Sequence, residues 1–372
     1  MKKVFALLLC LTMLGSAAAF AEEAQPSVTG AVTEIEKYGH ALLDITIEDF
    51  EAAGFTLGDI VTVTAGTYEG DMPYFNGYYV DRGEPMVRAY PGHTNIAVCI
   101  NYGRFADEAG IDVGSEVTIT LKEAGGARTL QEISNLVYSS ERDEYPSDEV
   151  FANFRPVVLG GIAEGMLYRS ASPVDNSFNR APYACALMEA AGVRAVLNLA
   201  DTAEELEARF AAEDFTAESY KALYEAGCVA AMGLPVNYTS DSFAEGIVAA
   251  LTFLSGQEGP FLVHCTEGKD RAGFTVMMLE ALMGASADEI VADYMQSYVN
   301  YYGLEAGTEK YDMVAQKNIM QMLTAVTGTE TLEGVDLQAA AVQYLLSHGM
   351  AQEAIDALRA ALGGAEALAD AA

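Results

Sequence analysis

The stretch Phe261-Leu262-Val263-His264-Cys265-Thr266-Glu267-Gly268-Lys269-Asp270-Arg271-Ala272-Gly273 decides the fold of the second half of the chain. Its apolar start follows the Gly259-Pro260 break and predicts a buried strand. Apolar residues then recur at helical spacing from Phe274 to Leu282 and predict a helix. The loop between the two elements therefore lies at a helix N-terminus, where backbone N–H groups and the helix dipole favour an anion.

The side chains of this loop indicate chemistry on a phosphoryl group. A helix N-terminus with a nearby His and Arg favours the reactive thiolate of a cysteine, and Cys265 has His264 beside it and Arg271 across the loop. Arg271 can offer two parallel donors to phosphate oxygens, and Gly268 lets the backbone curl around one anion. These features predict that Cys265 attacks phosphorus and forms a phosphocysteine that water then hydrolyses.

The pattern His264-Cys265-x-x-Gly268-x-x-Arg271 resembles the signature loop of cysteine-based protein tyrosine and dual-specificity phosphatases. Its second half, Gly268-Lys269-Asp270-Arg271, is similar to the loop of secreted bacterial tyrosine phosphatases and of phosphoinositide phosphatases. The resemblance extends over about residues 150–362, because weaker matches follow in the same order. These weaker matches are Asn153-Phe154-Arg155, residues 167–170, 195–199 and 288–294.

The resemblance implies an α/β phosphatase domain that needs no metal and no organic cofactor. It assigns catalysis to Cys265 and Arg271, with an Asp as general acid. The residues that it places in substrate binding are His264, Thr266, Glu267, Gly268, Lys269, Ala272 and Arg169. The alternative for Cys265 is an inert buried thiol at a strand end, and four matched loop positions in a strand–loop–helix context weigh against it.

Two departures leave parts of the mechanism open. The family usually has Ser or Thr after the arginine, and Ala272 predicts a slow second step with a burst of product. Asp270 and Asp241 are equal candidates for the general acid, ahead of Asp201. Asp270 could instead hydrogen-bond the loop backbone, and the other two could be helix caps.

Cations near the loop bear on the substrate. Lys269 resembles the second loop cation of phosphoinositide-active enzymes and would suit polyphosphorylated head groups. Alternatively it stabilises the single bound phosphate or faces solvent. Arg169 is a substrate-site cation by resemblance, and a surface ion pair is the alternative.

Strands and helices alternate after about residue 150, which predicts a mostly parallel central sheet flanked by helices. Cys265 then lies at the carboxyl ends of the strands, where such sheets bind ligands. The predicted helices are 183–191, 203–226, 242–254 and a tail at 333–370 interrupted at Gly349, and the predicted strands are 193–199, 228–231 and 260–264. Ser286 to Glu289 forms a capping box for a further helix.

Residues 27–135 predict a smaller β-rich domain with an internal repeat. Residues 54–64 match residues 110–120, and Tyr38-Gly39 corresponds to Tyr102-Gly103. Such a repeat is typical of a small barrel or sandwich, here an accessory or binding module. The region faintly resembles the β-rich domain of S-adenosylmethionine hydroxide adenosyltransferases, with no catalytic residue in common. The polar segment 139–149 predicts the linker to the phosphatase domain at 150–370.

Residues 1–21 read as a signal peptide, because a basic start and a short apolar core precede Ala19-Phe20-Ala21. A lipoprotein anchored at Cys10 is the weaker alternative. We therefore expect a secreted, periplasmic or cell-envelope protein that has no membrane span after signal removal.

Composition limits the partners. The net charge of −34 excludes nucleic acid as a partner and makes the phosphate site a local positive island. Export would permit a Cys185–Cys228 disulfide, and buried free thiols are the alternative. The four His residues show no metal-ligand spacing, so no metal is expected.

The sequence thus predicts an exported phosphatase that hydrolyses phosphomonoesters of phosphotyrosine proteins or peptides. One alternative is a phosphatase acting on phosphoinositide phospholipids or inositol polyphosphates. Another is a phosphate-binding pseudo-phosphatase whose β domain is an adhesive module.

Overall fold

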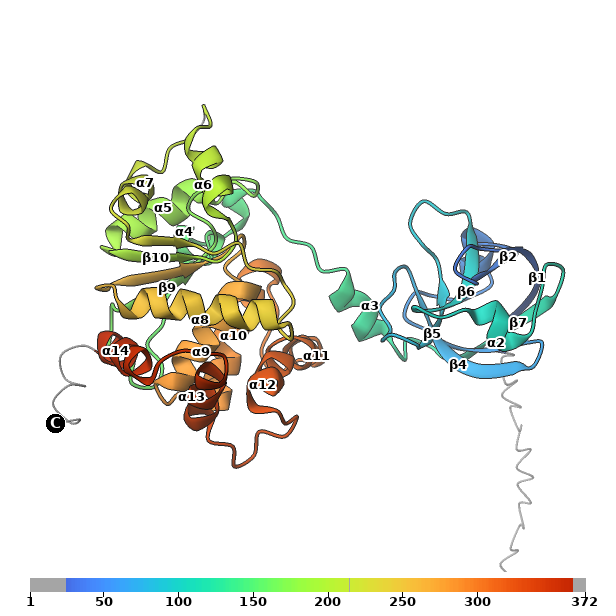
Figure 1. The fold of residues 1–372 in the computed structure, drawn as a ribbon. Coiled ribbons are helices and arrows are strands. Elements are labelled where there is room, and N and C mark those ends of the chain that lie inside the picture. Colours follow the sequence, from blue (N-terminus) through green and yellow to red (C-terminus); the bar gives the residue numbers. More distant parts are fainter. Residues whose placement is uncertain (1–24, 214, 364–372) are drawn as a thin grey trace, which may run out of the picture. The chain divides into compact units, whose positions relative to one another are not determined.

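The computed structural model describes residues 25–213 and 215–363, which form two compact units that divide between Gln131 and Glu132 (Figure 1). The predicted signal peptide at 1–21 lies outside the described residues. Within the described part of the chain, no helix is both long and apolar enough to cross a membrane.

The first unit is a closed barrel with strand order β1-β2-β6-β5-β4-β3-β7. The strands are β1 (Ser27–Ile35), β2 (Ala41–Thr46), β3 (Ile60–Ala65), β4 (Tyr68–Phe75), β5 (Pro85–Arg88), β6 (Asn95–Ile100) and β7 (Glu116–Glu123). Neighbouring strands are antiparallel except β4 and β5. Alternate residues such as Val61 and Val63 are fully buried in the barrel core, as the two-residue period of a strand requires.

The two segments that match in sequence have the same local structure. The short helices α1 (Ile47–Ala52) and α2 (Phe105–Ala109) precede them, and each segment continues into a strand, β3 or β7. Gly58 and Gly114 occupy equivalent turns with φ of +92° and +90°, a conformation that glycine adopts without strain. β3 and β7 then pair antiparallel.

The second unit is built on a sheet with strand order β11-β10-β12-β9-β8. The strands are β8 (Arg155–Pro156), β9 (Leu167–Ser170), β10 (Ala195–Asn198), β11 (Val229–Ala231) and β12 (Phe261–His264). Four of them are parallel, and β8 is antiparallel to its neighbour β9. The expected mostly parallel sheet is therefore present.

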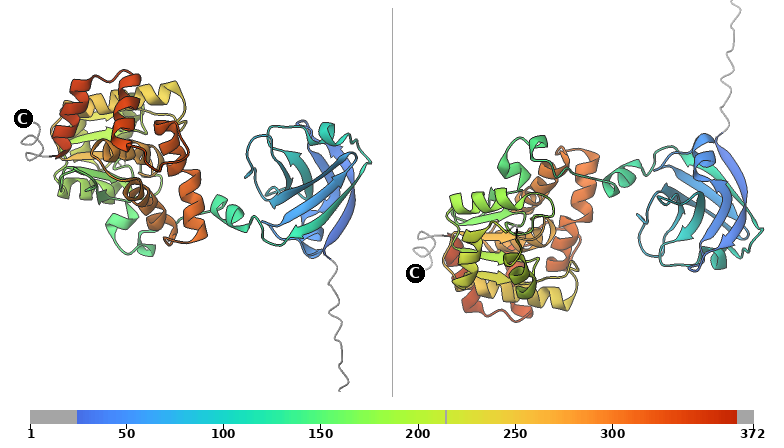
Figure 2. Two further views of the ribbon diagram at one scale, coloured as in Figure 1. Left: turned by 90° about the horizontal axis from the view of Figure 1, so that it is seen from below. Right: turned by 90° about the horizontal axis from the view of Figure 1, so that it is seen from above.

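Helices cover both faces of this sheet (Figure 2). The helices of the second unit are α4 (Asp148–Phe151), α5 (Ala181–Ala190), α6 (Ala203–Phe210), α7 (Glu218–Glu225), α8 (Asp241–Ser255), α9 (Asp270–Leu282), α10 (Ala287–Tyr302), α11 (Glu309–Lys317), α12 (Ile319–Thr327), α13 (Leu337–Ser347) and α14 (Gln352–Gly363). A further helix, α3 (Arg128–Ser134), spans the division between the two units. Val196 and Leu262 pack with α5 and α7, whereas Leu197 and Val263 pack with α8 and α9. Successive side chains of β10 and β12 therefore point to opposite faces of the sheet, and each face has its own hydrophobic core.

One predicted helix is wrong. The single helix expected at 203–226 is two helices, α6 and α7. The rings of Phe210 and Phe215 pack edge to face with centroids 5.3 Å apart, and Phe210 also contacts Tyr224. The chain must turn between α6 and α7 to bring these rings together, so tertiary packing overrides the helical pattern.

The predicted linker at 139–149 is also wrong, because this segment belongs to the second unit. The ring of Tyr145 is buried against Phe151, and Nη2 of Arg180 donates to the backbone oxygen of Ser139 at 2.9 Å. The polar composition of the segment concealed these anchoring aromatic contacts.

The Cys185–Cys228 disulfide is absent, since both cysteines are free. Sγ of Cys185 lies 3.4 Å from Oγ of Ser219 instead. Other expectations are confirmed. Ser286 and Glu289 form the capping box of α10, and Gly349, at φ +96°, separates α13 from α14.

Candidate active site

The loop that follows β12 lies at the carboxyl end of the sheet. β12 is between β10 and β9, and α9 begins at Asp270 (Figure 1). Cys265 is the first residue after the strand and is 3% exposed. The predicted strand–loop–helix arrangement is therefore present.

The backbone N–H groups of residues 266–269 have no hydrogen-bond acceptor among the described residues. Buried or half-buried N–H groups are rarely left unpaired in proteins. Here they belong to one short loop that leads into the N-terminus of α9. Consecutive free donors at a helix N-terminus form a binding site for an anion.

Neighbouring groups occupy the carbonyl groups of the same loop. Nδ2 of Asn153 donates to the backbone oxygens of Glu267 at 3.2 Å and Gly268 at 3.3 Å. The hydroxyl of Tyr301 donates to the backbone oxygen of Glu267 at 2.6 Å. With these acceptors satisfied by protein groups, the loop is held in a shape that leaves its donors available.

Gly268 is required by this shape for two reasons. Its φ is +68°, and a Cβ at this position would lie 2.2 Å from the backbone oxygen of Ser170. Any side chain would therefore push the loop away from the end of β9.

Arg169 contacts the loop from the buried side, from strand β9, and does not face substrate. It is fully buried, and its Nη2 donates to the backbone oxygens of Gly268 at 2.9 Å and Lys269 at 3.2 Å. Its Nη1 pairs with Asp293. The expected substrate contact and the surface ion pair are both wrong for Arg169, which is a positioning residue.

Asp293 joins Arg169 to the half-buried Arg155. Nε of Arg155 donates to Oδ1 of Asp293 at 2.8 Å. Burial alone would raise the pKa of Asp293, but Arg155 and Arg169 outweigh it and lower the pKa to about 2. The carboxylate is therefore charged at neutral pH and fixes both guanidinium groups.

Arg271 reaches back along the loop from the first turn of α9. Its Nη2 donates to Oγ1 of Thr266 at 3.2 Å, and its Nη1 donates to the backbone oxygen of Leu234 at 3.2 Å. Arg271 and Thr266 are partly exposed. The fold thus places Arg271 in contact with Thr266, the residue that follows Cys265.

His264 lies under the loop. It is fully buried, its Nε2 is 2.8 Å from the hydroxyl of Tyr220, and its Nδ1 is 3.3 Å from the backbone oxygen of Cys265. Burial lowers its pKa to about 4, and Arg271 acts in the same direction. Because the ring is fully buried, His264 does not face the substrate side of the loop. Because it is neutral at neutral pH, it does not supply the cation expected beside the thiol.

Lys269 and Glu267 neutralise each other on the loop. Nζ of Lys269 lies 3.2 Å from Oε2 of Glu267 and 3.9 Å from Oδ2 of Asp270. Glu267 also accepts a hydrogen bond from the hydroxyl of Tyr138. Burial disfavours the charged amine, but Asp270, Tyr298 and Glu267 outweigh it and raise the pKa of Lys269.

Among the three acid candidates, Asp270 alone belongs to the loop. The hydroxyl of Tyr294 donates to Oδ1 of Asp270 at 3.1 Å. Burial raises the pKa of Asp270, and the opposing effect of Lys269 does not cancel this rise. A carboxyl group that keeps its proton to higher pH suits a general acid.

The other two candidates are placed elsewhere. Asp241 is exposed in the first turn of α8 and lines a separate cavity of about 400 Å³ that contains no residue of the 264–271 loop. Asp201 is buried and accepts from Nε of Arg209 at 2.8 Å and Nδ2 of Asn198 at 2.9 Å. Neither side chain hydrogen-bonds to a residue of the 264–271 loop in the part of the chain that the structure describes.

Ala272 is fully buried in the first turn of α9 and belongs to the same apolar cluster as Cys265. No group of three or more His, Cys, Asp or Glu side chains with metal-binding geometry occurs in residues 25–213 and 215–363.

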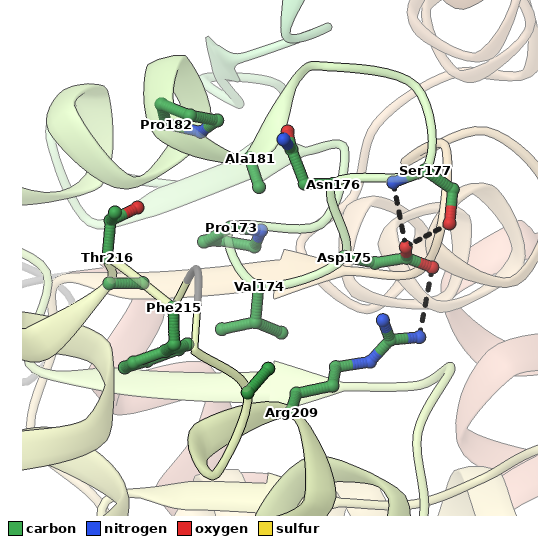
Figure 3. A pocket seen from close by; sticks show the side chains of 12 residues that line it. Pro173, Val174, Asp175, Asn176, Ser177, Ala181, Pro182, Arg209, Phe215 and Thr216 are labelled. Carbon is green, nitrogen blue, oxygen red and sulfur yellow. Dashed lines mark hydrogen bonds and ion pairs between the residues drawn. The ribbon is translucent and has the colours of Figure 1, made fainter.

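A pocket of about 290 Å³ is lined mainly by residues between Pro173 and Pro182, and by no residue of the 264–271 loop (Figure 3). The backbone N–H of Ser172 donates to the backbone oxygen of Thr266 at 3.1 Å, and the pocket wall begins at the next residue, Pro173. Across the pocket, Nη2 of Arg209 donates to Oδ2 of Asp175 at 3.0 Å.

Sequence reasoning missed the residues that hold the loop from behind, Asn153, Asp293 and Tyr301. Asn153 has φ +49°, a conformation uncommon for residues other than glycine. The signal was present for Asn153 and Asp293, because both lie in the flanking segments that resemble the phosphatases in order along the chain. Asn153 contacts the loop across 114 residues, and Asp293 contacts Arg169 across 124, so both contacts are visible only in the fold.

Comparison with known proteins gives a family. The sequence profile of the tyrosine phosphatase family matches residues 155–364, which is more than half of the chain. A triple specificity protein phosphatase, PtpB of Mycobacterium tuberculosis, is 32% identical over 106 residues, or 28% of this chain and 37% of PtpB. A Cupriavidus necator protein named as a candidate tyrosine-protein phosphatase is 50% identical over 36 residues, or 10% of this chain and 13% of that protein.

Solved structures show weaker similarity. The core catalytic domain of the PP-IP phosphatase SIW14 from S. cerevisiae matches with a TM-score of 0.26 and 17% identity, covering 44% of this chain and 88% of that domain. An uncharacterized conserved protein from Thermotoga maritima matches with a TM-score of 0.24 and 22% identity, covering 25% of this chain and 36% of that one. The extent of the profile match is what identifies the chain, which belongs to the tyrosine phosphatase family.

Proposed function

We propose that this protein hydrolyses phosphomonoesters, with phosphotyrosine in proteins or peptides as the substrate class, through a phosphocysteine intermediate. The observation that carries the proposal is the row of unpaired backbone N–H groups at residues 266–269, between Cys265 and Arg271. Three equatorial phosphoryl oxygens need several donors around one point, and this loop supplies them with a guanidinium.

Each step has a group in place. The sulfur of Cys265 forms a bond to phosphorus as the bond from phosphorus to the ester oxygen breaks, and Asp270 gives its proton to that oxygen. Water then attacks the phosphocysteine while Asp270 takes a proton, which releases inorganic phosphate and the thiolate. Asp270 is returned to its acid form, so the cycle closes without another reactant.

Lys269 bears on the alternative substrate, a phosphoinositide or inositol polyphosphate. The name of PtpB describes three specificities for that protein, and a broad substrate range is an open alternative here. In this chain the Lys269 amine is already paired with Glu267. A cation whose charge is compensated adds little attraction for a second phosphate, which favours a simple phosphomonoester.

Export of the enzyme remains part of the proposal and rests on the signal-like sequence at 1–21. The strongly acidic composition, with net charge −34, makes nucleic acid an unsuitable partner. The pseudo-phosphatase alternative rests on Ala272, and the fold gives it no further support because Asp270 supplies an acid in the loop.

The test is hydrolysis of p-nitrophenyl phosphate by the full-length chain and by Cys265→Ser. We expect turnover by the wild type and a loss of at least about a thousandfold in the variant. Absence of turnover in a folded wild type would contradict the proposal and support the pseudo-phosphatase. A phosphotyrosine peptide, a phosphoinositide and an inositol polyphosphate, compared by kcat/KM, then decide the substrate class.

A further inference from the structure

The barrel gathers its exposed aromatic rings in one place. Among the described residues the exposed tyrosines are Tyr38, Tyr78, Tyr90 and Tyr102, at 63%, 38%, 42% and 80%. All four border two neighbouring cavities of about 690 Å³ and 440 Å³, which share Tyr38, Tyr78 and His40. We call the two cavities together the tyrosine recess. The other sixteen tyrosines of the chain are buried or half-buried, so this grouping indicates a binding surface.

Polar groups with compensated charge form the wall of this recess. Arg88 is 5% exposed, and its Nη2 donates to Oε1 and Oε2 of Glu36 at 3.2 and 3.1 Å. Its Nη1 donates to the hydroxyl of Tyr78 at 3.0 Å. Because the guanidinium is matched by a carboxylate, the recess offers both donors and acceptors but no large excess of positive charge.

His40 adds a neutral group that both cavities share. Its Nδ1 lies 3.1 Å from Oε2 of Glu36, and its Nε2 has no hydrogen-bond partner within the described part of the chain. Burial lowers the pKa of His40, with Arg88 acting in the same direction. The ring is therefore neutral at neutral pH and retains one nitrogen for a ligand.

The backbone fixes the two most exposed rings. Tyr102 has φ +58°, which is uncommon for a bulky residue and recurs at binding sites. Gly39 approaches Arg104 so closely that a Cβ on Gly39 would lie 2.7 Å from Cβ of Arg104. Nη1 of Arg104 also donates to the backbone oxygen of Lys37 at 3.2 Å. The two Tyr-Gly pairs found in the sequence thus belong to loops that are locked to each other.

We propose that the tyrosine recess binds an uncharged oligosaccharide. The C–H faces of sugar rings pack on flat aromatic rings, and each sugar hydroxyl both donates and accepts hydrogen bonds. Beside these rings, Arg88, Glu36 and His40 provide both hydrogen-bond donors and acceptors. Rigid aromatic side chains that surround a few fixed polar groups are typical of small-ligand sites.

Two other ligand classes fit less well. An anionic ligand would meet the Glu36 carboxylate beside Arg88. A proline-rich peptide suits aromatic grooves, but its prolines lack N–H donors and would leave the acceptors of Glu36 and the free His40 nitrogen unused. The compensated polar wall therefore favours a ligand rich in hydroxyl groups.

The test is isothermal titration calorimetry of the full-length chain with uncharged hexasaccharides, namely cellohexaose, chitohexaose and mannohexaose. We expect saturable binding of at least one of them. The double variant Tyr38→Ala/Tyr102→Ala should weaken that binding at least about tenfold. The control Val113→Ala, also exposed on the barrel at 64% and outside the recess, should change it by less than about twofold.

A second measurement avoids variants. A saturating hexasaccharide should slow nitration of Tyr38 and Tyr102 by tetranitromethane in the wild-type chain, with the rate at Tyr311 unchanged. No saturable binding of any hexasaccharide would overturn the proposal, as would binding that survives the double variant. Tighter binding of decaproline through the same rings would assign the recess to peptide recognition and would also overturn it.

Discussion

The loop at residues 265–271 and the tyrosine recess each lie against a buried arginine that is paired with a carboxylate, yet they favour opposite ligands. Arg169 is neutralised by Asp293 behind the loop, and Arg88 is neutralised by Glu36 in the barrel. The loop has a further, partly exposed cation, Arg271, and a row of free N–H groups. The recess instead exposes tyrosine rings. The groups that remain available at the surface, rather than the buried arginine itself, therefore decide the class of ligand.

Replacing one arginine in the loop and one in the recess should give the largest difference in phosphatase activity. Arg271→Lys removes the planar pair of donors and should lower kcat/KM for p-nitrophenyl phosphate by about a hundredfold to a thousandfold. Arg88→Lys should leave this value unchanged within about twofold. Steady-state kinetics of both variants make the comparison. A loss of less than about threefold for Arg271→Lys would show that the loop amides act without it.

A pair of glycines tests whether the loop shape is essential. Gly268→Ala places a Cβ 2.2 Å from the backbone oxygen of Ser170, whereas Gly192 has a similar φ of +65° with open space around it. Gly192→Ala should cost about 1 kcal/mol of unfolding free energy and no activity, because only the backbone conformation is strained. Gly268→Ala should cost about 2 to 3 kcal/mol and lower kcat/KM by about tenfold or more.

Urea unfolding and p-nitrophenyl phosphate kinetics measure both quantities for the two glycine variants. Equal effects of the two substitutions would mean that the approach of the loop to β9 has no role.

Acidification should destabilise the second unit through His264. The folded-state pKa of His264 is lowered to about 4 from an ordinary value of 6.5. The neutral ring is therefore favoured by folding, so its contribution is complete above pH 6.5 and is lost as the pH falls toward 4. Between pH 7 and pH 5 this loss is about 2 kcal/mol.

Urea unfolding of the second unit at both pH values tests this expectation. His264→Asn should reduce the loss on acidification by that amount. An unchanged pH dependence in this variant would show that another group is responsible.

The pH–rate profile tests Asp270 as the acid. The raised pKa of Asp270 keeps the carboxyl protonated to higher pH, and activity should fall as the pH rises through that pKa. Asp270→Asn should abolish this basic limb and lower kcat by about tenfold to a hundredfold, whereas Asp241→Asn should leave the profile intact. A basic limb that persists in Asp270→Asn would exclude Asp270.

The smallest effect concerns Ala272. Stopped-flow traces should show a burst of product followed by a slower phase, since no hydroxyl follows Arg271 to stabilise the leaving thiolate. Ala272→Ser should speed the slow phase by about twofold to tenfold. A wild type without a burst and a variant without a gain would together remove this explanation.

The sequence predicted contacts between residues that are close along the chain, but not contacts between residues that are far apart along it. Cys265, Gly268 and Arg271 lie within one strand–loop–helix segment, so their proximity followed from local pattern. Arg169 and Asp293 meet across 124 residues, and no local pattern could show that their pairing makes Arg169 a positioning residue.

Local patterns also misled in two places. The polar segment 139–149 suggested a linker, but Tyr145 anchors it to the second unit. His264 stands beside Cys265 in sequence, but the strand turns its side chain toward Tyr220 in the core. In both cases the position of the segment or side chain depends on packing partners that are distant in the sequence.

The central claim is that Cys265 carries the phosphoryl group during turnover. Acid quenching during hydrolysis of p-nitrophenyl phosphate, followed by peptide mass spectrometry, measures this directly. We predict that the peptide containing Cys265 gains the mass of one phosphoryl group in the wild type and in Arg88→Lys, and gains none in Cys265→Ser. Sustained turnover with no such adduct, or a Cys265→Ser variant that retains wild-type turnover, would contradict the account.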